Sequence, residues 1–440
     1  MHLNAHLDVD VVALESDDSV TVMLELQAPA APETDTTRPE HTAVVVLDRS
    51  GSMSGGRLTH AKRALIDLVD RLDDRDRFGL VVFDNESEVV VPAGKVGDLG
   101  RDRIRRGIAS VRTRGATDLS SGYFRGLQEA RRVCTQAGAT LVLLSDGRAN
   151  AGVTDPEALA SAARNAARQS VTTSTVGIGT GYDETILAAM AGGGSGNHAF
   201  AEHADGAVAA VAGELDGLLS KTVQAASLLI EPTSDVARVA LLNEGLPAQR
   251  VEGGVLAELG DFYAGETRRV TVTIDVPAMA ALGLAQVATL TVRYVELATL
   301  AEHTMTVPVS VNVVPADVAA GRVPDPVVEE EKLIQQTQTE KRLAEEALRE
   351  GNRDAARESV RRAKQRLLAA QPSLSSAELA DELAWLEESE RALRDRDADY
   401  SRKRMSSDRW RKNRGYKSRP QGGQVVDDPS EGSPGSTDAA

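Results

Sequence analysis

Hydrophobic and polar residues alternate in different ways along this chain, and the changes divide it into parts. Between residues 41 and 220, continuous hydrophobic runs such as 43–47 and 140–144 alternate with segments whose apolar residues recur at helical spacing. Short hydrophobic runs separated by helices are typical of parallel strands that are buried on both faces. We therefore expect a Rossmann-like, doubly wound α/β domain over residues 41–220.

Turn signals place the edges of this domain. The pair Asp84-Asn85 separates apolar runs at 78–83 and 88–91, which predicts a hairpin at one edge of the sheet. At the other end, we expect a closing helix at 205–219 after the last strand.

Period-two alternation dominates on both sides of the α/β domain. Residues 222–315 contain several alternating runs punctuated by prolines, which predicts a β-sandwich. Residues 1–40 contain two shorter alternating runs with a turn at Asp17-Asp18, followed by a linker. Because a lone hairpin is not stable in water, we expect it to join the sandwich. The α/β domain would then be an insertion.

Residues 327–400 are highly charged, with apolar residues near helical spacing and a break at Gly351-Asn352. This pattern favours an α-hairpin that packs on the sandwich or on another copy of the chain. A coiled-coil dimer is the alternative, although the apolar stripe does not keep a strict heptad for long. The pattern leaves the oligomeric state open.

Residues 401–440 consist of a basic segment and a tail. The segment 402–419 has nine Lys and Arg residues against one acid, Asp408, with Trp410 and Tyr416 among them. Basic residues mixed with aromatics suit contact with nucleic acid, which would make the segment a tether. In the alternative interpretation, the segment pairs with acidic helices of the same chain. The Gly-, Ser- and Pro-rich tail from about residue 421 is expected to be disordered.

Composition and charge narrow the classes of protein to which this chain can belong. The 440 residues carry a formal net charge of −16, which argues against general nucleic-acid binding by the whole molecule, and Cys134 is the single cysteine. No run of about 18 uncharged apolar residues predicts a membrane span, and the first residues do not resemble a secretion signal. We expect a cytoplasmic protein of several domains.

Oxygen-bearing side chains follow the two hydrophobic runs of the α/β domain. Asp48, Ser50 and Ser52 come after the first run, and Asp146 follows the second. Because parallel strands end at one edge of a sheet, these side chains should meet there, and Thr117 could join them from a neighbouring loop. Few carboxylates with several hydroxyls suit Mg²⁺, with Mn²⁺ or Ca²⁺ as alternatives. The competing interpretation is that these residues only cap helices and form turns.

The three-part set Asp48-x-Ser50-x-Ser52, Thr117 and Asp146-Gly147 resembles the metal-ion-dependent adhesion site of von Willebrand factor A domains. The resemblance implies that Ser50 and Ser52 bind the cation directly, and that Thr117, Asp48 and Asp146 bind it directly or through water. We expect the neighbouring Asp118 to cap a helix and not to be a ligand. Because so few protein charges leave the cation electrophilic, we expect an Asp or Glu of a protein partner to complete its coordination.

From this resemblance we expect a metal-dependent scaffold or adaptor that is not an enzyme, with no catalytic residues and no organic cofactor. Bacterial relatives of this architecture suggest an AAA+ ATPase as a partner. The alternative function is a metal-dependent hydrolase that uses the same oxygens, although the sequence shows no general base or second metal cluster beside them.

Overall fold

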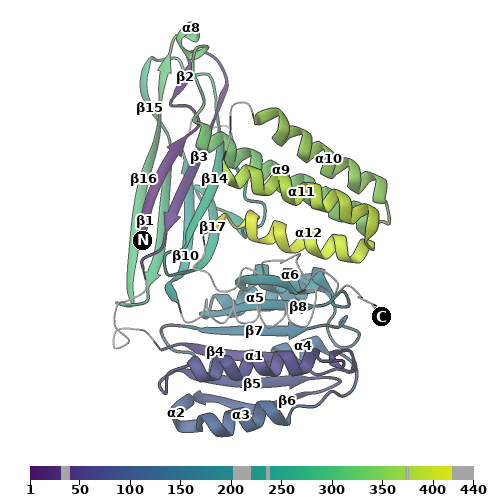
Figure 1. Ribbon diagram of the computed structural model, residues 1–440. Coiled ribbons are helices and arrows are strands. Elements are labelled where there is room, and N and C mark those ends of the chain that lie inside the picture. Colours follow the sequence, from purple (N-terminus) through teal and green to yellow (C-terminus); the bar gives the residue numbers. More distant parts are fainter. Residues whose placement is uncertain (31–39, 202–219, 234–237, 372–373, 375, 419–440) are drawn as a thin grey trace, which may run out of the picture.

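The computed structural model describes residues 1–30, 40–201, 220–233, 238–371, 374 and 376–418. Figure 1 shows three parts: an α/β domain, a β-sandwich that extends away from it, and a group of C-terminal helices beside the sandwich. The predicted closing helix at 205–219 and the tail from 421 lie outside the described residues. None of the described helices combines the length and hydrophobicity that crossing a lipid bilayer requires.

The α/β domain contains a six-stranded sheet with the order β6-β5-β4-β7-β8-β9. Its strands are β4 (Thr42–Asp48), β5 (Arg77–Phe83), β6 (Ser87–Lys95), β7 (Ala139–Ser145), β8 (Val171–Ile178) and β9 (Ser195–Ala201). All neighbours are parallel except the β5–β6 pair, which forms the predicted antiparallel hairpin at one edge. Every residue of β4 and β7 is buried, as the continuous hydrophobic runs predicted.

Helices cover both faces of this sheet, so the doubly wound fold is confirmed. Val45 and Leu47 of β4 belong to one hydrophobic core, while Val44 and Val46 belong to another on the opposite face. The first core is closed by α1 (Arg57–Arg71), α2 (Val96–Leu99) and α3 (Arg101–Ser110), and the second by α4 (Leu119–Val133), α5 (Pro156–Ala167) and α6 (Glu184–Gly193).

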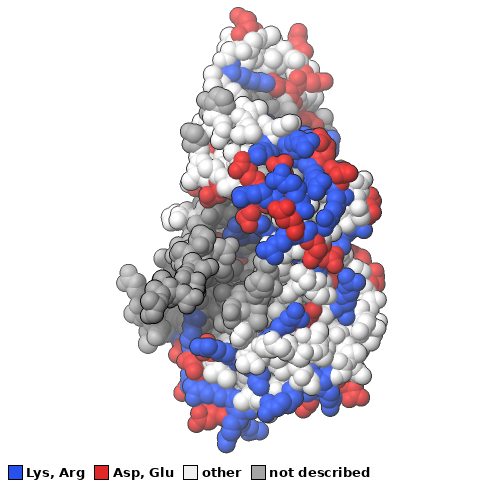
Figure 2. All heavy atoms as spheres, turned by 45° about the vertical axis from the view of Figure 1, so that its right-hand side comes forward, with Lys and Arg blue, Asp and Glu red and all other residues white. Residues whose placement is uncertain are grey.

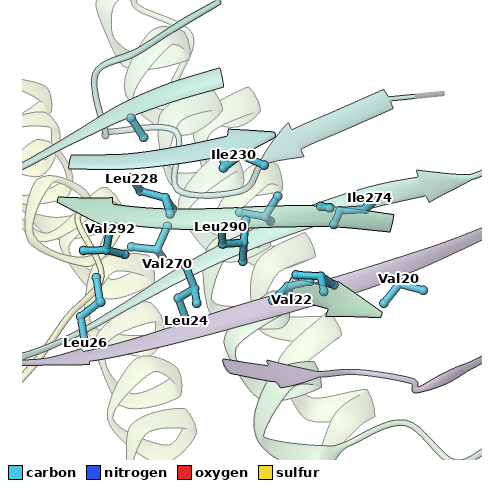
Figure 3. Close-up of a cluster of buried hydrophobic side chains, with 14 of the residues drawn as sticks. Val20, Val22, Leu24, Leu26, Leu228, Ile230, Val270, Ile274, Leu290 and Val292 are labelled. Carbon is cyan, nitrogen blue, oxygen red and sulfur yellow. The ribbon is translucent and has the colours of Figure 1, made fainter. Parts of the chain in front are cut away.

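Two mostly antiparallel sheets form the sandwich, with the orders β1-β3-β14-β11 and β12-β13-β10-β15-β16-β2. The strands are β1 (His2–Leu7), β2 (Val11–Ala13), β3 (Asp18–Gln27), β10 (Lys221–Pro232), β11 (Arg238–Leu241), β12 (Ala248–Val251), β13 (Gly254–Tyr263), β14 (Thr267–Val276), β15 (Gly283–Glu296) and β16 (Ala301–Val314). Side chains from both sheets, including Leu24, Val270 and Leu290, meet in one core (Figure 3). Because β3 pairs with β14 over its whole length, the α/β domain interrupts the sandwich in sequence.

The N-terminal hairpin differs from its prediction. Strand β1 does pair with β3, but β2 leaves that sheet and runs parallel to β16 in the other. The buried carboxylate of Asp8 explains the break, since its Oδ1 accepts hydrogen bonds from the backbone N–H groups of Val9 and Thr21, both at 2.7 Å. The predicted turn at Asp17-Asp18 is also misplaced, because the chain turns at Glu15 and Ser16 and Asp18 is already the first residue of β3.

The C-terminal helices share a hydrophobic core of their own. They are α9 (Pro326–Arg349), α10 (Arg353–Ala370), α11 (Ala377–Asp395) and α12 (Ala398–Asn413), preceded by the short α8 (Ala316–Ala319). Gly351 and Asn352 separate α9 from α10 as predicted, and the Asn352 side chain caps α10 by accepting a hydrogen bond from the N–H of Ala355.

The basic segment is folded over its described part, 402–418, and does not form a free tether. It forms most of α12 and then the short strand β17 (Tyr416–Ser418), which pairs with β14. Its cations meet acids of the same chain, in the pairs Arg402–Glu184, Lys403–Glu184, Arg404–Glu388, Arg409–Glu345 and Lys412–Glu382. Figure 2 shows basic and acidic side chains interspersed over the helical part. These ion pairs confirm that the described part of the segment pairs with acidic side chains of the same chain.

Candidate metal centre

Asp48 is the last residue of β4 and is fully buried at the carboxyl end of the sheet. Its Oδ1 accepts a hydrogen bond from the backbone N–H of Ser50 at 2.8 Å, and its Oδ2 accepts one from the Ser145 hydroxyl at 2.6 Å. Ser145 ends the neighbouring strand β7. The two strand ends are thus joined through this carboxylate, which fixes its orientation.

Hydroxyl groups connect the loop that carries Ser50 and Ser52 with Asp146. The Oγ atoms of Ser50 and Ser52 lie 2.9 Å apart, and the Ser52 hydroxyl donates to Oδ1 of Asp146 at 2.6 Å. Ser50 and Asp146 are buried, whereas Ser52 is exposed. The cluster is therefore open to solvent on the Ser52 side.

Thr117 enters the same cluster from the loop before α4. A methyl group built on Gly147 would lie 3.1 Å from Thr117 Oγ1, 3.3 Å from Ser52 Oγ and 3.7 Å from Asp48 Oδ2. Three oxygens, two from the Asp48–Ser52 loop and one from Thr117, therefore surround one point beside the Gly147 backbone. Asn150 holds the threonine in place through two hydrogen bonds of 3.2 Å, one to each backbone polar group of Thr117.

The structure thus brings together all five residues predicted from the sequence. Asp118 is placed as expected, because its carboxylate caps α4 through the N–H of Ser121 and does not join the cluster. Two carboxylates and three hydroxyls form a donor set that fits a hard divalent cation such as Mg²⁺. Within the described residues, no group of three or more His, Cys, Asp or Glu side chains offers a more highly charged site.

Electrostatics also suit a cation at this point. Burial raises the pKa of Asp48 to about 6, against hydrogen bonds from Ser145 and Ser50, and the nearby Asp146 carboxylate raises it further. A bound cation would favour the ionised form of both carboxylates and relieve their repulsion.

Arg57 also contacts the cluster, although it was not identified from the sequence. Its Nη1 lies 2.7 Å from Asp146 Oδ2 and 3.2 Å from the backbone oxygen of Ser52. Arg57 opens α1, and its position nine residues after Asp48 carries no pattern that would have identified it. The guanidinium reaches the cluster because the start of α1 lies beside Asp146, the residue after β7.

Comparisons with known proteins agree with this fold. Residues 43–212 match the family model described as von Willebrand factor type A domain. The chain is similar to protein sll0103 of Synechocystis sp. (29% identity over 159 residues, 36% of this chain and 37% of that protein) and to YfbK of Escherichia coli (29% over 165 residues, 37% and 28%). Inter-alpha-trypsin inhibitor heavy chain H4 of Homo sapiens is 31% identical over 146 residues, which are 31% of this chain and 15% of that protein. The matches thus span between 15% and 37% of these relatives' lengths.

Two solved structures resemble nearly the whole chain. A von Willebrand factor type A protein from Catenulispora acidiphila superposes with a TM-score of 0.70 and 16% identity, covering 89% of each chain. The ArnB paralog VWA2 from Sulfolobus acidocaldarius gives a TM-score of 0.60 and 15% identity, covering 92% of this chain and 98% of that one. At these identities the likeness concerns the fold. Residues 43–212 are therefore a von Willebrand factor type A (VWA) domain, within a chain that adds mostly antiparallel β-sheets and C-terminal helices.

Proposed function

We propose that this chain is a metal-dependent protein-interaction module and not an enzyme. VWA domains are generally protein-interaction modules, and the observation that carries the metal role is the convergence of Asp48, Ser52 and Thr117 oxygens around one point beside Gly147. In the proposal, these residues together with Ser50 and Asp146 hold Mg²⁺, with Mn²⁺ or Ca²⁺ as alternatives. The metal supplies an electrophilic position for an outside oxygen ligand.

The partner that fits this position is a protein that offers an Asp or Glu carboxylate. A hard cation held by only two carboxylates keeps positive charge and binds a further anionic oxygen well. We place the protein in the cytoplasm as a scaffold or adaptor, and we consider an AAA+ ATPase a suitable first partner to test.

The experiment compares wild type with Asp48→Asn in affinity capture from the native lysate, each in Mg²⁺ and in EDTA. Asparagine is chosen because its carbonyl can still accept from Ser50 N–H, and its amide can donate to the Ser145 hydroxyl. The proposal expects a partner that only wild type in Mg²⁺ retains. Equal recovery under all four conditions, from two folded proteins, would overturn it.

A further inference from the structure

The C-terminal helix α12 lies against the VWA domain as well as against the other helices (Figure 1). Its Lys403 side chain is fully buried and points to the loop that precedes α6. There the ammonium group donates to the backbone oxygen of Tyr182, lies 4.2 Å from the centre of the Tyr182 ring and 3.3 Å from Glu184 Oε2. A fully buried lysine that contacts both Tyr182 of this loop and Glu184, the first residue of α6, fixes the loop firmly.

The same loop touches the metal centre on its other side. A methyl group built on Gly181 would lie only 2.7 Å from the backbone oxygen of Asp146. The backbone of Gly181 is therefore packed directly on the residue whose carboxylate belongs to the oxygen cluster. Two residues further on, Asp183 caps α6 by accepting from the N–H groups of Thr185 and Ile186, so the loop has little freedom to shift alone.

A second contact joins α12 to the centre at the solvent edge. Arg148, two residues after Asp146, lies 3.7 Å from Asp399 in the first turn of α12. Both side chains are largely exposed, so this pair alone adds little. It does show that the start of α12 reaches the loop that carries Asp146.

From these contacts we infer that Lys403 is a positioning residue for the metal centre, and that docking of α12 sets the affinity of the centre for its cation. The inference rests on the proposed metal function and adds a means of regulating it. Coupling between two sites is reciprocal. The cation therefore tightens the docking of α12, and a partner that pulls α12 away releases the cation.

The test uses the full chain and the variant Lys403→Met, with Mg²⁺ binding measured by isothermal titration calorimetry. Methionine fills similar space, and Glu184 keeps a cationic partner because Arg402 Nε lies 2.7 Å from it. We expect Mg²⁺ affinity to fall about tenfold, within the usual range of coupling between sites. Arg404→Met is the matched control, since Arg404 is the next residue but pairs with Glu388 of α11. The Mg²⁺ affinity of this variant should equal that of wild type.

Hydrogen exchange of the metal-free protein supplies a second readout. Amides at 146–150 and 181–186 should exchange faster in Lys403→Met and not in Arg404→Met, while Mg²⁺ should slow exchange in α12 of wild type. If Lys403→Met does not fold, Gly181→Ala is the second variant, because its methyl group displaces the same loop from Asp146 without substituting a residue of α12. It should also weaken Mg²⁺ binding. Wild-type affinity in the folded variant overturns the inference alone, whereas absence of Mg²⁺ binding by wild type overturns the proposed metal function.

Discussion

Arg57 and Asp146 form an ion pair at the edge of the oxygen cluster, with Nη1 2.7 Å from Oδ2. The guanidinium holds one oxygen of a carboxylate whose other oxygen accepts from Ser52. Arg57 therefore competes with a cation for Asp146, and its positive charge opposes the approach of a second one.

The variant Arg57→Met should bind Mg²⁺ about fivefold more tightly, because removing a partly exposed charge pair is worth roughly 1 kcal/mol. Titration calorimetry at constant ionic strength measures this change. Arg103→Met, on the exposed side of α3, serves as a control for the loss of one positive charge. Weaker binding by Arg57→Met would show instead that the arginine holds Asp146 in its ligating orientation.

Gly147→Ala should abolish Mg²⁺ binding without removing a single ligand atom. Its methyl group would occupy the point that Thr117, Ser52 and Asp48 surround. Gly51→Ala is the matched control in the same cluster, because its methyl group would meet only the Gly115 oxygen at an ordinary 3.6 Å. Unchanged binding by Gly147→Ala would place the cation elsewhere.

Mg²⁺ affinity should depend on pH through Asp48. Because the pKa of this buried carboxyl is raised to about 6, a proton occupies it below that pH and must leave before the cation binds. Affinity should fall about tenfold for each pH unit below 6 and level off above 7. Constant affinity between pH 5 and 7 would show that Asp48 does not bind the cation.

His198 should make stability depend on pH independently of the metal. Burial and the nearby ammonium of Lys403 lower the pKa of His198 to about 3, so the folded protein resists protonation that the unfolded chain accepts near pH 6.5. The contribution of neutral His198 to the free energy of unfolding is therefore fully present above pH 6.5. It declines by about 1.4 kcal/mol per pH unit as the pH falls towards 3. Between pH 7 and 5, urea unfolding of wild type should lose about 2 kcal/mol more than that of His198→Asn. Equal losses of stability by wild type and His198→Asn would show that the pKa of His198 is not lowered in the folded protein.

The buried ion cluster of the helices gives a stability prediction. Lys341 Nζ lies 2.6 Å from Glu382 and 2.5 Å from Asp408, all three nearly or fully buried. Lys341→Met leaves two buried acids with too little positive charge and should lower the free energy of unfolding by about 3–5 kcal/mol, measured by urea unfolding followed by far-UV circular dichroism. Arg361→Met, which breaks an exposed pair with Glu358, should cost about 0.5 kcal/mol or less. Similar costs for the two variants would contradict a structural role for the cluster.

Local patterns predicted most of the α/β fold and the meeting of five oxygen-bearing side chains at one edge of its sheet. The strand that ends at Asp48 is buried on both faces, and a strand of that kind has a continuous hydrophobic sequence that can be recognised directly. By contrast, the departure of β2 from the first sheet depends on Asp8 meeting Thr21, a tertiary contact that periodicity does not encode. The position of the basic segment likewise depends on ion pairs with acidic residues far away in the sequence, such as Glu184.

The pairing of β3 with β14 has a consequence for biosynthesis. Glu25 and Arg269, which form an ion pair across these strands, are 244 positions apart in the chain. A ribosome must therefore release the whole VWA domain before β3 can find its neighbour. Since domains generally fold as units during synthesis, the VWA domain should be structured first, while β3 has β1 on one edge and no partner on the edge that β14 will occupy. That one edge of β3 is then open to wrong partners until β14 is synthesised, and slow translation between residues 220 and 276 would lengthen the interval.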